Sequence, residues 1–105
     1  MSYLPEIYQG FKQHFPEVVK AYDDLAATCH QCGSLDQKTR RLIKLGIAMG
    51  LSSAGGVRSH TRRALEEGVS PDELRHAVLM VLTTAGFPTM IASMKWVEEV
   101  IEKSR

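Results

Sequence analysis

The sequence predicts an all-α fold, a bundle of five or six helices forming a single domain over residues 1–105. Three observations favour this fold. Apolar residues recur every three or four positions through most of the chain, which is the spacing of an amphipathic helix. Capping residues and prolines precede several of these segments. The length of 105 residues suits one domain with a modest core.

The composition is that of a soluble globular protein, with 44% hydrophobic residues, 24% charged residues and a net charge of +1. No apolar run reaches the roughly 18–20 residues that a membrane span needs, and the first ten residues do not resemble a signal peptide. We therefore expect a cytoplasmic protein that binds neither nucleic acid nor a membrane.

The N-terminal third predicts two helices. A short helix is expected over residues 3–14, although Gly10 weakens it. Pro16 suits the first turn of a firmer helix, in which apolar residues continue at helical spacing to Cys29. Gly33 is the expected stop.

Ser34 is the expected cap of the third helix, with Gln37 as its capping partner. A small-residue elbow follows over residues 51–56, and the fourth helix is expected to start near Gly56 and stop at Gly68. On the solvent side of that helix we expect two ion pairs at i,i+4 spacing, Arg62–Glu66 and Arg63–Glu67.

The strongest local signal begins at Ser70. Serine as the cap, Pro71 in the first position and Glu73 three residues after the cap form the pattern of a capping box. This fifth helix is expected to end at Gly86, and Pro88 to start the last one. The third and fifth helices are more apolar than a monomer of this size can cover, so we expect a homo-oligomer.

Two cysteines form a CxxC motif, Cys29-His30-Gln31-Cys32, at the end of the second helix. Three roles are open: packing, thiol redox chemistry with a redox partner, or a metal site that would also need His30 or His60. A helix C-terminus disfavours a thiolate, which argues against the redox role. We expect no metal and no cofactor.

His60 lies one turn into the helix that follows the elbow, and it is either a packed core histidine or an acid/base group in a pocket. Arg58 and Arg62 flank His60 and are candidates either for binding a carboxylate or for ion pairing alone. Ser53, in the elbow, is a further candidate for binding substrate. Residues 37–65 hold seven Lys and Arg and no Asp or Glu. Such a basic segment suits a small anionic substrate, and the alternative is that these cations pair with acidic side chains of other helices or of another subunit.

Two stretches, LDQKTRRLIKL (35–45) and SSAGGVRSHTRRALEEGVSPDELRHAVLMVLTTAGFP (52–88), closely resemble the carboxymuconolactone decarboxylase-like family, which includes the alkylhydroperoxidase D proteins. The resemblance covers about 35–101, the expected family core, and leaves 1–34 as N-terminal helices. It implies an all-helical fold assembled as trimers or hexamers, with a site near the elbow helix and the subunit contacts.

In the peroxidase branch of this family, the elbow helix carries a CxxC motif that is followed four residues later by the histidine, and a helix glutamate precedes the motif. Aligned on His60, the cysteine positions hold Ser53 and Gly56, and the glutamate position holds Arg41. The peroxidase relay of that branch is therefore absent, and the elbow is more similar to that of the decarboxylase branch.

The lead hypothesis is a decarboxylase-like lyase that acts on a small anionic substrate with His60 as acid/base. One alternative is peroxiredoxin-like thiol chemistry through Cys29 and Cys32. The other is a non-catalytic helical oligomer or partner-binding protein.

Overall fold

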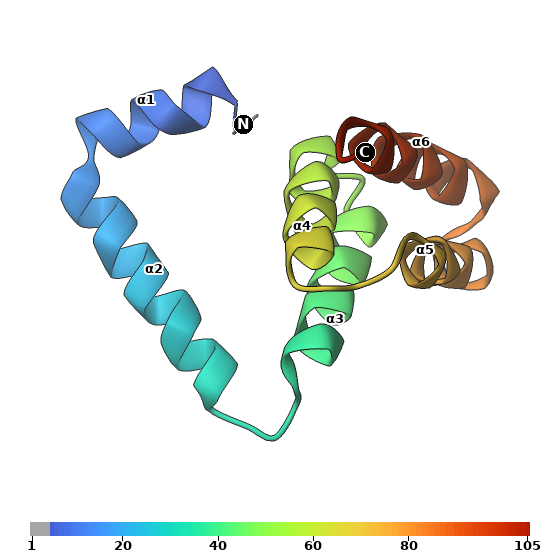
Figure 1. Cartoon of the computed structure of the whole chain (residues 1–105), viewed down its shortest axis with the longest axis horizontal. Coiled ribbons are helices and arrows are strands. Elements are labelled where there is room, and N and C mark those ends of the chain that lie inside the picture. The colour runs from blue at the N-terminus through green and yellow to red at the C-terminus, as the bar shows by residue number, and fades with distance from the viewer. Residues whose placement is uncertain (1–4) are drawn as a thin grey trace. The chain divides into compact units, whose positions relative to one another are not determined.

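The computed structural model describes residues 5–105 and confirms the all-α fold. The helices in this range are α1 (Glu6–His14), α2 (Pro16–Gln31), α3 (Gln37–Gly50), α4 (Ala54–Glu66), α5 (Pro71–Ala85) and α6 (Phe87–Lys103), as Figure 1 shows. They fall into two compact units, one up to Leu35 and the other Asp36–Arg105. None of the helices described in residues 5–105 combines the length and apolar character needed to cross a membrane.

The unit Asp36–Arg105 is a four-helix arrangement in which α3 packs on α4 and α5, and α6 packs on the same two helices. Its core consists of aliphatic side chains from all four helices, and Leu45, Val57, Val78 and Val97 are completely buried. The unit up to Leu35 holds α1 and α2, whose sole buried side chain among residues 5–35 is Val19.

Local signals account for most helix ends. The capping box at Ser70 is confirmed: its hydroxyl accepts from Glu73 N, and the Glu73 carboxylate accepts from Ser70 N at 2.9 Å. The expected cap of the third helix is wrong. Asp36, not Ser34, caps α3 and accepts from Thr39 N at 2.8 Å, because its carboxylate lies directly before the first helical residue.

The elbow between α3 and α4 is set by backbone hydrogen bonds. Ser53 N donates to Ala48 O and Ser52 N donates to Met49 O, both at 3.0 Å, which is a Schellman motif with Ser52 in the left-handed conformation (φ 55°). Ser53 then caps α4 by accepting from Gly56 N at 3.2 Å. The fourth helix therefore begins at Ala54, two residues before the expected start near Gly56.

Candidate functional site

A group of charged side chains around His60 joins α3 to α4. Arg41, on α3, is only 7% exposed. Its Nη1 lies 2.8 Å from Nδ1 of His60, which is half-buried on α4. Its Nε and Nη2 donate to the two carboxylate oxygens of Glu67, at 3.1 and 2.9 Å. We call Arg41, His60 and Glu67 the imidazole triad.

Helix geometry explains why these three residues meet. Arg41 lies one turn into α3 and points inward with the buried residue Leu45, four positions further on. Glu67 is the C-cap of α4, and Gly68 follows with φ 92°, so the chain turns away there. The packing of α3 against α4 then brings a glutamate from the end of one helix to an arginine near the start of the other.

Glu67 has a partner that the expected pair Arg63–Glu67 does not include. It accepts two hydrogen bonds from Arg41, a residue 26 positions earlier in the chain. A bidentate guanidinium–carboxylate contact in a partly buried place is stronger than an exposed i,i+4 pair. Glu67, with a side chain 18% exposed, therefore belongs to the group around His60.

The surroundings of His60 disfavour its charged form. Burial, followed by the positive charges of Arg41, Arg63 and Lys44, lowers the pKa of His60 to about 4, and the opposing effect of Glu67 is smaller. The imidazole is therefore neutral at neutral pH. A neutral imidazole among cations can bind a substrate anion without adding a charge of its own.

The other predicted site residues lie in several places. Ser53 is the cap of α4 at the elbow, Arg58 donates to Glu99 on α6 at 3.1 Å, and Arg62 is half-buried on α4. Cys29 and Cys32 are free, exposed thiols at the end of α2, in the unit up to Leu35. The structure therefore brings His60 together with Arg41 and Glu67, which the sequence did not identify as site residues.

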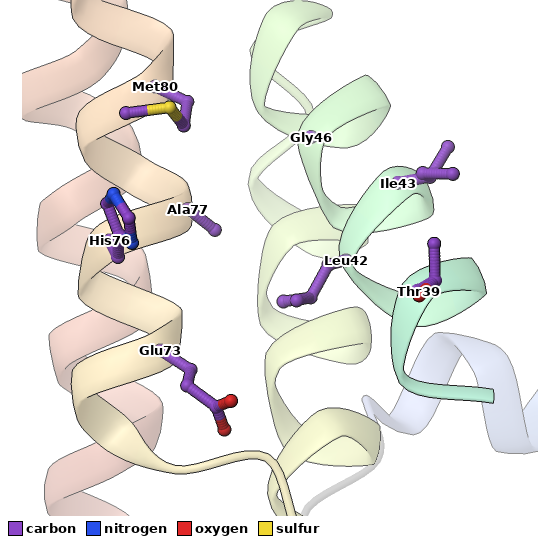
Figure 2. Close-up of a pocket in the computed structure, with 8 residues that line it drawn as sticks. All are labelled: Thr39, Leu42, Ile43, Gly46, Glu73, His76, Ala77 and Met80. Carbon is purple, nitrogen blue, oxygen red and sulfur yellow. The ribbon is translucent and has the colours of Figure 1, made fainter. Parts of the chain in front are cut away.

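A cavity of about 450 Å³ lies between α3 and α5 in the unit Asp36–Arg105. Figure 2 shows Leu42 reaching from α3 toward α5, with Ala77 and Glu73 reaching from α5 toward α3. The full lining is Thr39, Leu42, Ile43, Gly46, Glu73, His76, Ala77 and Met80. This lining is mainly apolar and includes no member of the imidazole triad.

Comparison with known proteins identifies the class. The model of the carboxymuconolactone decarboxylase family matches residues 16–99, so the chain belongs to that family. The match begins further toward the N-terminus than the expected core of 35–101 and includes α2.

Two relatives carry the names of decarboxylases. The chain is 34% identical over 80 residues to nitrosuccinic acid decarboxylase of Metarhizium robertsii, covering 72% of this chain and 56% of that one. It is 32% identical over 68 residues to 4-carboxymuconolactone decarboxylase of Acinetobacter baylyi, covering 65% of this chain and 51% of that one. The chain thus spans about half the length of these two enzymes.

A solved structure has the same fold. The apo form of a carboxymuconolactone decarboxylase family protein from Legionella pneumophila superposes with a TM-score of 0.80 at 23% identity. The superposition covers 95% of this chain and 89% of that chain. It supports the all-α architecture and carries no information on substrate.

Proposed function

We propose that this chain is a decarboxylase-like enzyme that acts on a small carboxylate-bearing molecule and binds it against His60. The observation that carries the proposal is the neutral, half-buried imidazole of His60, held by Arg41 in a cationic environment. The names of the two decarboxylase relatives support the reaction class.

The expected chemistry needs two things from the protein. Nearby positive charges, such as those of Lys44 and Arg63, favour the approach of a carboxylate. As the carbon–carbon bond to that carboxylate breaks and carbon dioxide leaves, the electron pair stays on the substrate and builds negative charge on an adjacent oxygen. An imidazole N–H beside that oxygen lowers the barrier by hydrogen bonding to it.

Binding of a substrate carboxylate by Arg58 or Arg62 stays a prediction. Arg58 is ion-paired with Glu99 at 3.1 Å, so it would have to exchange that partner for the substrate. The pair is partly exposed, which makes the exchange inexpensive.

The test is carbon dioxide release from a panel of small lactone acids and dicarboxylic acids. We expect turnover by the unmodified protein and a loss of at least about 100-fold in kcat/KM for His60→Gln, as for removal of a key transition-state donor. His14→Gln, on the exposed surface of α1, is the matched control and should keep full activity. No turnover on any of these acids by the unmodified protein contradicts the proposal.

Thiol chemistry is the second candidate, because Cys29 and Cys32 are both free and exposed and lie three positions apart. One sulfur would attack the O–O bond of a peroxide and become a sulfenic acid, and the other would displace water from it to form a disulfide. Counting free thiols before and after peroxide treatment tests this candidate: an unchanged count rejects it. If both candidates fail, a non-catalytic helical assembly remains.

We also propose that the chain assembles into a homo-oligomer, a trimer or a hexamer. The support is a set of large apolar side chains on α3 and α5 that stay exposed in the isolated chain, namely Ile43, Ile47, Leu79 and Met80. Exposed apolar surface of this kind marks an interaction site in a soluble protein.

A further inference from the structure

We propose that Arg41 and Glu67 are positioning residues that hold His60 in the tautomer with its proton on Nε2, so that His60 acts on a substrate only as a hydrogen-bond donor. The mechanistic half of this inference rests on the proposed function, since it assumes that substrate binds at His60. The structural half, the tautomer, stands without any substrate and is measured separately.

The tautomer follows from the chemistry of the Arg41–His60 contact. A guanidinium has five N–H donors and no acceptor. Because Arg41 Nη1 lies 2.8 Å from His60 Nδ1, the ring nitrogen must accept that hydrogen bond with its lone pair. A neutral imidazole carries one proton, so the proton is on Nε2.

Glu67 makes the contact directional. Its two oxygens accept from Nε and Nη2 of Arg41 and fix the plane of the guanidinium, which leaves Nη1 aimed at the imidazole. Arg41 is almost fully buried, so water does not readily replace either partner. Arg41 and Lys44 of α3, with Arg63 and Glu67 from α4 and its C-cap, are the charged groups that act on His60.

This arrangement narrows the acid/base role expected for His60. The lone pair at Nδ1 is used by Arg41, and Nε2 already carries a hydrogen, so the ring as held has no site to accept a proton. The carbon that loses carbon dioxide must then take its proton from water. Arg41 and Glu67 do not touch the substrate in this scheme and act through the orientation of the imidazole alone.

Nitrogen-15 NMR of the full-length labelled protein tests the tautomer directly. The His60 ring signals are assigned by their absence in His60→Gln. At neutral pH we expect Nδ1 to resonate as an unprotonated nitrogen and Nε2 as a protonated one. Arg41→Met replaces the donor by an apolar side chain. In this variant we expect His60 to populate both tautomers and its pKa to lie closer to the ordinary value.

Arg75→Met is the matched control. Arg75, on α5, makes a similar bidentate contact with Glu98 on α6, at 2.7 and 3.0 Å. Within residues 5–105, the structure shows no contact between Arg75 and His60. Its loss removes an interhelical Arg–Glu pair without touching the imidazole triad. The His60 signals of this variant should match those of the unmodified protein.

Two results overturn the inference: an Nδ1–H or mixed tautomer in the unmodified protein, or an unchanged Nε2–H tautomer in a folded Arg41→Met variant. If Arg41→Met does not fold, the spectrum of the unmodified protein still decides, and Glu67→Gln gives the second comparison, with a partial shift toward mixed tautomers expected. The spectra do not depend on the outcome of the decarboxylation assay. Failure of the proposed function is therefore distinguishable from failure of Arg41 and Glu67 to fix the tautomer of His60.

Discussion

At the scale of single residues, the imidazole triad places a charged pair in a largely buried position, with the Arg41 side chain 8% exposed and that of Glu67 18% exposed. Removing both charges of a buried pair costs little, whereas removing one leaves the other without compensation. Arg41 and Glu67 therefore depend on each other for stability as well as for the orientation of His60. The consequence is a difference between single and double variants.

We expect Arg41→Met to lower the free energy of unfolding by about 3–5 kcal/mol, because Glu67 keeps its charge in a partly buried place. The double variant Arg41→Met with Glu67→Leu should recover most of that loss. Arg75→Met, which breaks a more exposed pair, should cost much less than Arg41→Met. Urea denaturation followed by circular dichroism measures all three, and equal losses for the single and double variants would refute this account.

The depressed pKa of His60 predicts how stability depends on pH. The folded protein has a pKa of about 4 for this group against an ordinary value of 6.5, so between these values the unfolded chain binds a proton that the folded chain does not. The free energy of unfolding therefore falls as pH drops from 6.5 to 4, and the contribution is fully present above 6.5.

His60→Gln should lose most of this decline between pH 6.5 and 4. Above pH 7 its pH dependence should parallel that of the unmodified protein, because His60 is neutral in both states there. Urea midpoints measured at half-unit pH intervals make the comparison. A decline of equal size in both proteins would mean that His60 is not the group responsible.

At the scale of helices, two adjacent glycines of α4 differ in their surroundings. A Cβ at Gly56 would lie 2.8 Å from Ser53 Oγ and 3.2 Å from the Ala48 side chain, whereas one at Gly55 would meet nothing within 4 Å. The close approach at Gly56 is what allows Ser53 to cap α4 while α3 ends beside it.

We expect Gly56→Ala to lower the free energy of unfolding by about 1–2 kcal/mol, since the Ser53 cap and the contact with Ala48 are both disturbed. Gly55→Ala, its neighbour and control, should raise it by up to about 1 kcal/mol through helix propensity. Thermal unfolding distinguishes the two variants. A Gly56→Ala variant more stable than the unmodified protein would contradict the close contacts expected for a Cβ at this position.

Helix ends are predictable from sequence where all the residues that form the cap lie close together in the chain. The Ser70 capping box was predictable because its residues lie within one helical turn. The cap of α3 was misassigned because Ser34 and Asp36 are both good capping residues two positions apart. This error does not change the fold class, which depends on the repeated apolar spacing.

The site was predictable only in part. His60 was identified from its place after the elbow, but its partners come from α3 and from the end of α4. Arg41 lies four positions before Leu45 and so on the buried face of α3, but helical spacing alone does not say which side chains of α4 meet it there. The one available signal was the family resemblance, in which Arg41 falls at the position where the peroxidase branch has a glutamate.

At the scale of the whole molecule, the exposed apolar side chains of α3 and α5 predict that this face binds a second copy of the chain. Ile47 is 58% exposed and Met80 52% exposed in the isolated chain. Because these side chains are only about half exposed, covering them with a second copy would contribute roughly 1 kcal/mol each. Self-association is therefore expected to depend on this face.

Sedimentation velocity should show an assembly larger than one chain, and Ile47→Glu should shift it toward monomer because a charge cannot be buried unpaired. Lys95→Glu, an exposed substitution on α6, is the control for a change of charge. Circular dichroism should show both variants helical. A monomeric unmodified protein, or an assembly indifferent to Ile47→Glu, would contradict this expectation.

The Arg41–Glu67 pair also constrains which residues can replace each other at these two positions. Changing Arg41 to glutamate alone would set two carboxylates side by side beside His60, where each opposes ionisation of the other. A glutamate at position 41 therefore requires a change of Glu67 at the same time. The two positions are expected to vary together, since losing either partner alone leaves the other charge buried without compensation.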